Sequence, residues 1–139
     1  MAKSTIKIEN DMYLALAGTL TNIIGGTFYR RGTRPIESKD EDAVLTVSTA
    51  SAEQIQTGRA RLNIYVQNID CGFKSLVPNT QRIEEIAAKD EEIVKVLNDS
   101  CIGFNFWLSQ STGMIAVPDK PEHFVNMTID FQQNELTKE

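Results

Sequence analysis

The chain of 139 residues has the length of one ordinary domain, and 41% of its residues are hydrophobic, enough to bury a core without disulfides or metals. Its 14 Lys and Arg against 19 Asp and Glu give a net charge of -5. This charge repels phosphate backbones, so general nucleic-acid binding is disfavoured, although it leaves room for a local basic patch.

The first residues place Lys3 and Lys7 ahead of a short apolar run, a pattern that a signal peptide shares. Glu9 and Asp11 stand directly before this run, which spans only residues 12–20, and no small-residue cleavage site follows it. No stretch reaches the roughly 18 apolar residues that a membrane helix requires. We therefore expect a soluble protein that is cytoplasmic at synthesis.

Apolar residues at three- and four-residue spacing predict a short first helix that ends at the pair Gly25-Gly26. Asn10 or Asp11 is the expected cap, because either side chain accepts hydrogen bonds from the free amides of a first turn. The apolar positions of this helix are Met12, Leu16, Leu20 and Ile23. The glycine pair lets the backbone turn, and the β-favouring residues 27–31 then predict a first strand.

The next two strands are predicted by alternation of apolar and polar residues, which is typical of half-buried strands. One covers residues 43–49 and follows a charged connector, residues 36–42, that we expect to be a solvated loop. The other spans about residues 59–69. Its inward side chains are Leu62, Ile64 and Val66. Residues 50–58 between the two strands are compatible with a loop or with a single helical turn.

A second helix is predicted after Pro78, with Asn79 or Thr80 as its cap. Its apolar residues recur with a period of 3.6. They are Ile83, Ile86, Ala87, Ile93, Val94 and Leu97. Asp90 lies within this apolar stripe, so we expect it to sit at the edge of the stripe or to find a polar partner.

The last part of the chain predicts two more strands. Alternation over residues 102–108 gives a fourth strand, and alternation over residues 122–131 gives a fifth. Between them, residues 114–117 form a short apolar piece, and two prolines keep the connection irregular. Residues 133–139 are expected to be a polar tail that frays.

The order of these elements predicts an α+β fold in a single domain over residues 1–139. We expect a mainly antiparallel sheet of about five strands, with two helices packed on one side, in the order α-β-β-β-α-β-β. The sequence contains no internal repeat and no low-complexity tract.

Residues for conventional catalysis or metal binding are scarce. His123 is the only histidine and stands at the mouth of a strand without a nucleophile motif, so we expect a structural hydrogen bond there. Cys71 and Cys101 have no metal-ligand spacing and are expected to be free thiols. The acidic groups 84–85 and 90–92 alternate with lysines, as on a solvated helix face. We predict no catalytic, cofactor-binding or metal-binding residue and no enzymatic activity.

Four residues are candidates for a protein interface: Arg59, Arg61, Tyr65 and Trp107. Each lies opposite the apolar face of its own strand. Aromatic and arginine side chains supply much of the binding energy at protein interfaces, because they bury a large area and also form hydrogen bonds. The alternative is that a helix or long loop of the same subunit covers this face, and the sequence leaves both readings open.

The order of these elements resembles that of the tail-terminator or tail-completion family of tailed phages. Proteins of Bacteroides-type prophages are similar especially in two of the strands. The resemblance covers most of the chain and rests on short motifs. They are the strand Phe28-Tyr-Arg-Arg31, the turn Arg34-Pro35, the strand ending near Thr49, the strand Asn63-Ile-Tyr-Val66, the helix from Ile83 to Leu97 and the strand His123-Phe-Val-Asn-Met-Thr-Ile-Asp-Phe131. One departure from the family pattern is the long connection from Ser109 to Glu122, where a tight hairpin would be simpler. Our hypothesis is that this connection is an additional contact arm.

The resemblance implies a virion protein that is made in the bacterial cytoplasm and is not an enzyme. Such proteins form a ring, usually of six subunits, that caps the tail tube and joins it to the neck of the head. Its partners would be its own copies, the tail-tube protein and neck or connector proteins, with no membrane and no specific nucleic-acid binding, although DNA would pass through the ring. No cofactor is implied.

Two other classes of protein remain compatible with the sequence. A head-tail connector or neck ring protein would follow the same assembly logic with different partners. A non-viral α+β domain that binds a small ligand is the third reading.

Overall fold

The computed structural model describes residues 3–50, 55–70, 72 and 76–134. Its elements are α1 (Thr5–Thr21), β1 (Phe28–Arg30), β2 (Ala43–Ala50), β3 (Thr57–Gln67), β4 (Ile69–Asp70), β5 (Leu76–Val77), α2 (Thr80–Ala87), α3 (Asp90–Ser100), β6 (Phe104–Leu108), β7 (Gly113–Ala116) and β8 (Glu122–Gln133). The α+β class is confirmed.

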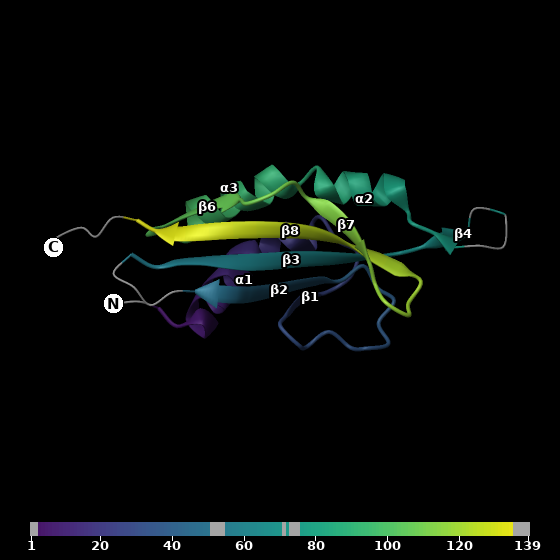
Figure 1. Ribbon diagram of the computed structural model, residues 1–139, viewed down its shortest axis with the longest axis horizontal. Coiled ribbons are helices and arrows are strands. Elements are labelled where there is room, and N and C mark those ends of the chain that lie inside the picture. The colour runs from purple at the N-terminus through teal and green to yellow at the C-terminus, as the bar shows by residue number, and fades with distance from the viewer. Residues whose placement is uncertain (1–2, 51–54, 71, 73–75, 135–139) are drawn as a thin grey trace.

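A six-stranded sheet forms the body of the molecule, in the order β1-β2-β3-β8-β6, with β7 also paired to β8 (Figure 1). Only β1 runs parallel to its neighbour, so the sheet is mainly antiparallel, as expected. Because β3 pairs with β8 along its whole length, β6 and β7 share the other side of β8. Sequence reasoning missed β7 as a strand, and it also missed the small sheet of β4 and β5.

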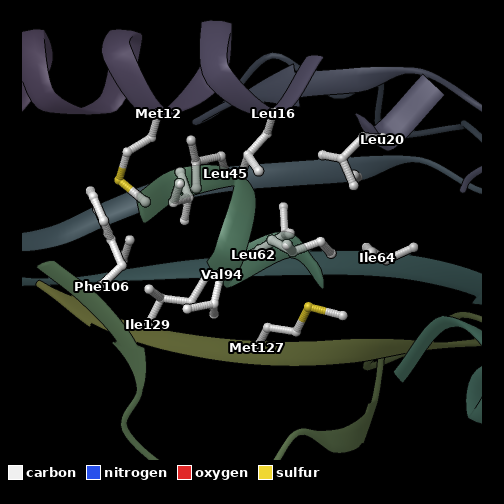
Figure 2. Close-up of a cluster of buried hydrophobic side chains, with 14 of the residues drawn as sticks. Met12, Leu16, Leu20, Leu45, Leu62, Ile64, Val94, Phe106, Met127 and Ile129 are labelled. Atoms are coloured by element: carbon white, nitrogen blue, oxygen red, sulfur yellow. The ribbon is translucent and has the colours of Figure 1, made fainter. Parts of the chain in front are cut away.

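The core lies between one face of this sheet and the helices. The register aligns Leu45, Leu62 and Met127 across three neighbouring strands, and all three side chains are fully buried. Met12 and Leu16 of α1 point from the helix onto these strands (Figure 2). Full burial of one such side chain contributes about 1.5–3 kcal/mol, so the strand alternation and the helix period stabilise the same layer. Packing of the helices on one side is confirmed.

The first helix begins earlier than expected. Ser4 is its cap, because the Ser4 Oγ accepts a hydrogen bond of 3.0 Å from the backbone N–H of Lys7. The expected caps, Asn10 and Asp11, lie inside the helix instead. Ile8, four residues before Met12, is buried and extends the apolar stripe by one turn, which explains the difference.

The second helix is divided in two, which corrects the expectation of two helices in all. α2 ends before Asp90, and α3 begins at it. One Asp90 oxygen accepts from the backbone N–H of Glu91 at 2.7 Å, and the other accepts from Thr112 Oγ1 at 2.7 Å. The carboxylate therefore lies at a helix N-terminus, where free N–H groups favour it. The expectation that Asp90 needs a partner is confirmed.

The start of β6 and the end of β8 also differ from expectation. Ile102 is 89% exposed and is not part of β6, because Gly103 adopts a φ of +96°, outside extended geometry. β8 continues to Gln133, and the N–H of Asn134 donates to the carbonyl of Gly103 at 2.7 Å. The first two residues of the expected tail are thus hydrogen-bonded, and residues 135–139 lie outside the described part of the chain.

Three further strand boundaries differ from expectation. β3 begins at Thr57 and ends at Gln67, two residues earlier at each end than expected. The choice between a loop and a helical turn over residues 50–58 falls partly on residues 51–54, which lie outside the described residues. β2 extends through Ala50, one residue beyond the expected end.

Replacement of Ile86 by Asp tests the core. Ile86 is fully buried on α2, so the substitution places an unpaired charge in an apolar layer and should prevent folding or lower the melting temperature by well over 10 °C. Gln81→Asp, at an exposed position of the same helix, is the matched control and should change little. Circular dichroism melts compare the variants. An Ile86→Asp melt within two degrees of the parent would show that α2 does not dock here.

Candidate interaction surface

The four interface candidates lie on the face of the sheet opposite the core, called the outer face here. All three described helices contribute to the core on the other side, and α1 passes behind β2 and β3 in Figure 1. The centre of the outer face carries a chain of polar side chains. Asn126 Nδ2 donates to Asn63 Oδ1 at 2.7 Å, and Thr128 Oγ1 donates to Asn126 Oδ1 at 3.0 Å. No described helix covers this face.

Arg59 and Trp107 lie together at one end of the outer face. The register places Asp130 of β8 opposite both Arg59 of β3 and Trp107 of β6. Arg59 Nε lies 2.7 Å from Asp130 Oδ1, and this hydrogen-bonded pair raises the pKa of Arg59 above its ordinary value. Trp107 is 42% exposed beside the pair. Together with Gln132 they line a hollow of about 280 Å³.

Arg61 lies next along β3 and is exposed between Thr46 and Thr128. No ion pair or hydrogen bond joins its guanidinium to the part of the chain that the structure describes. Its charge is therefore open to a partner.

Tyr65 lies near the other end of the outer face and is in a different environment. The Arg34 guanidinium lies 3.9 Å from the centre of the Tyr65 ring, and the ring of Phe124 lies 5.4 Å from it. Burial raises the pKa of the Tyr65 hydroxyl. The connection between β1 and β2, which carries Arg34, thus covers Tyr65, and the reading that the same subunit covers the surface holds at this end.

Arg34 is the centre of a buried charge cluster that sequence reasoning missed. Its Nε lies 3.0 Å from Asp42 Oδ2, and its Nη1 lies 3.3 Å from Glu122 Oε1; both carboxylates are almost fully buried. Asp42 also accepts from the N–H of Thr27 at 2.8 Å and from Ser38 Oγ at 2.5 Å. The available signal was a charged residue at the start of each of two strands, with Asp42 directly before β2 and Glu122 as the first residue of β8. The pairing over 88 residues was not readable from the sequence.

The remaining chemical candidates lie apart from the outer face. His123 Nδ1 is 2.8 Å from Asn68 Oδ1, so the expected structural hydrogen bond is present. Cys101 is a free thiol whose Sγ contacts the carbonyl of Asp11 at 3.8 Å, and burial raises its pKa. Cys71 lies outside the described residues. Among the described residues, no three His, Cys, Asp or Glu side chains gather as metal ligands, and no helix is long and apolar enough to cross a membrane.

Comparison with known proteins gives a likeness in fold. One chain of a solved structure of the virion of a native gene transfer agent particle matches with a TM-score of 0.54 and 10% identity, over 95% of this chain and 98% of that chain. A second solved chain, identified only by a sequence label, matches with a TM-score of 0.57 and 13% identity, over 99% and 100% of the two chains. No protein-family model and no curated protein matches significantly. The fold is thus shared with these chains over almost their whole lengths.

Replacement of Arg34 by Met tests the buried cluster. Methionine preserves much of the side-chain volume but leaves the buried Asp42 carboxylate without a counter-charge and Glu122 with only Lys120 Nζ, 3.9 Å from its Oε1. The free energy of unfolding should fall by about 3–5 kcal/mol. Arg61→Met on the exposed part of β3 is the control and should change it by less than about 0.5 kcal/mol. Urea unfolding measures both. Equal effects of the two substitutions would contradict the cluster.

The same cluster predicts a loss of stability in acid. Burial by itself raises the pKa of Asp42, but hydrogen bonds from Ser38, Thr27 and Arg34 outweigh it and hold this pKa below its ordinary value. As pH falls, Asp42 therefore binds a proton in the unfolded chain before it does so in the folded chain. Its contribution to the free energy of unfolding is present above about pH 4 and is lost as pH falls from there through the pKa of the folded chain. Asp42→Asn should be less stable at pH 7 and show a shallower decline in acid. Urea titrations at several pH values check this, and an unchanged slope would contradict it.

Proposed function

We propose that this protein is a structural component of a tailed phage or phage-like virion, and specifically a ring-forming tail terminator that caps the tail tube and joins it to the neck. The observation that carries the proposal is the near full-length likeness in fold to a chain of a gene transfer agent virion. Because both chains are covered almost completely, the shared part is the whole domain and not a fragment. The proposed location of the protein is therefore the virion.

The distribution of exposed apolar side chains supports assembly from several copies. Trp107 stands on the outer face, whereas Leu14 is 64% exposed on α1 and Ile102 follows α3. Leu14 and Ile102 line one hollow with Cys101. Two different apolar surfaces on one subunit suit a heterologous contact, in which one surface of a copy meets the other surface of the next and rotation closes a ring.

The charges are also compatible with a ring around DNA. A net charge of -5 would let DNA pass without strong binding to the subunits. The same observations support a connector or neck ring equally, because that class differs only in the proteins that it contacts. Partner identity separates the two roles.

The direct test is assembly with the tail-tube protein of the same virion. Size-exclusion chromatography with light scattering should show a closed oligomer, either from the protein by itself or after addition of tail tubes. Mass spectrometry of purified particles should find the chain in the virion. A species that stays monomeric at high concentration and with tail tubes, and is missing from particles, would rule the proposal out. Binding to portal or neck proteins but not to tubes would assign the connector role.

Variants of the outer face sharpen this test. Trp107→Ala and Arg61→Glu remove an aromatic anchor and reverse an exposed charge, and each should weaken assembly by about 2 kcal/mol, roughly 30-fold. Both leave the buried core intact. Light scattering over a dilution series measures the change.

His123→Gln is the matched control, because it retains hydrogen-bonding capacity toward Asn68 and should assemble like the parent. Complementation of a tail-defective phage compares all three variants. If the His123 variant folded and assembled normally but gave no infectious particles, the non-enzymatic reading would fail, and a chemical role for the imidazole would follow.

A further inference from the structure

β7 is an exposed edge strand in the long connection between β6 and β8. Its four residues, Gly-Met-Ile-Ala, are all exposed and uncharged, and Met114 and Ile115 are each 47% exposed. Among the described strands, β7 pairs only with β8. Natural proteins usually protect such edges with charges, prolines or covering segments, because an open edge accepts another strand. β7 has none of these within its four residues.

The other edges of the sheet are capped by side chains. On β1, the carbonyl of Phe28 accepts from the Tyr13 hydroxyl at 3.1 Å, and the carbonyl of Arg30 accepts from Thr33 Oγ1 at 2.8 Å. Where β2 extends beyond β1, the N–H of Val47 donates to Glu9 Oε1 at 3.2 Å. The Val47 carbonyl accepts from the guanidinium of Arg31.

β6 is capped in the same way by α3. The side-chain amide of Asn98 accepts from the N–H of Phe106 at 2.8 Å and donates to the Phe106 carbonyl at 3.0 Å. One helix side chain thus occupies both backbone groups that an added strand would use at the middle of β6. β1, β2 and β6 are all protected against strand addition at these positions.

The backbone of β7 shows which of its groups face outward. The N–H of Val117 donates to the carbonyl of Glu122 at 3.0 Å. Because hydrogen-bonded pairs alternate along an antiparallel ladder, Ile115 directs its N–H and carbonyl toward β8. Met114 and Ala116 therefore direct theirs away from it. Within the part of the chain that the structure describes, no side chain caps these four groups.

The side chains of β7 continue two apolar rows of the sheet. On the outer face, Ile115 lies opposite Phe124, which lies opposite Tyr65. On the other face, Met114 lies opposite Val125, which lies opposite Ile64. A strand added to β7 would extend both rows, so its alternate side chains would each meet an apolar neighbour.

We propose that the open edge of β7 binds an extended, uncharged segment of another protein, with apolar side chains, as an additional β-strand. A second copy of this chain is a poorer occupant, because the β1, β2 and β6 edges of its six-stranded sheet are capped, and among the described edges of that sheet this leaves its own β7. Pairing of β7 with β7 is two-fold and gives dimers, whereas a ring needs a heterologous contact. The identification of the partner as a virion protein rests on the proposed function. The inference that the β7 edge accepts a strand is independent of that function.

A display library of random heptapeptides, selected on the full-length protein, is the probe. We expect enriched peptides without proline, with apolar residues at alternate positions, and at least tenfold weaker binding to Met114→Pro and Met114→Lys. Met114→Pro removes only an outward N–H, and Met114→Lys introduces a protecting charge. Trp107→Ala should bind the peptides as the parent does. Amide resonances of Met114 and Ala116 should shift on binding.

Ile115→Pro is the folding control, because it removes an N–H that faces β8 and should lower the melting temperature more than Met114→Pro does. The inference is overturned if no selected peptide depends on position 114, or if the peptides bind through Trp107. It is also overturned if Met114→Lys disrupts the homo-oligomer, which would assign the edge to a second copy. If the protein is monomeric but still binds peptides at β7, the proposed ring is wrong and the inference about the β7 edge stands.

Discussion

The buried contact of Arg34 with Asp42 and Glu122 fixes where two strands of the sheet begin. Asp42 directly precedes β2, and Glu122 is the first residue of β8. These strands flank β3, so one guanidinium sets the ends of both neighbours of the long strand. Two carboxylates at this depth need a counter-charge, since an unpaired buried charge costs several kcal/mol. The arginine therefore stabilises the strand starts and brings the connection between β1 and β2 over Tyr65.

Much of the fold was readable from periodicity. Alternation identified β2, β3, β6 and β8, and the 3.6-residue period identified the buried sides of the helices, because burial on one face imposes these periods. Boundaries were less accessible. Ser4 as a cap depends on one hydrogen bond and the break at Asp90 on two, and the side-chain partner of Asp90, Thr112, comes from the connection between β6 and β7.

The candidate surface was predictable only in part. Alternation placed Arg59, Arg61, Tyr65 and Trp107 on the outer face, but only the strand order brings Arg59 and Trp107 to the same acidic residue. Nothing local to Tyr65 indicates that Arg34 stacks on it. The uncapped edge of β7 was unpredictable for a related reason, since it stands out only against the other edges, which side chains of α1 and α3 close.

The central position of β8 has a consequence for synthesis. β8 is the last described strand along the chain, yet it pairs with β3, β6 and β7. Its contacts with β3 join residues such as Gln67 and Glu122, 55 positions apart, and Arg59 and Asp130, 71 positions apart. A nascent chain cannot close the sheet until β8 has left the ribosome, so the edge of β3 that pairs with β8 stays open until then. Closing such long loops also makes folding slow relative to a helical domain of similar size.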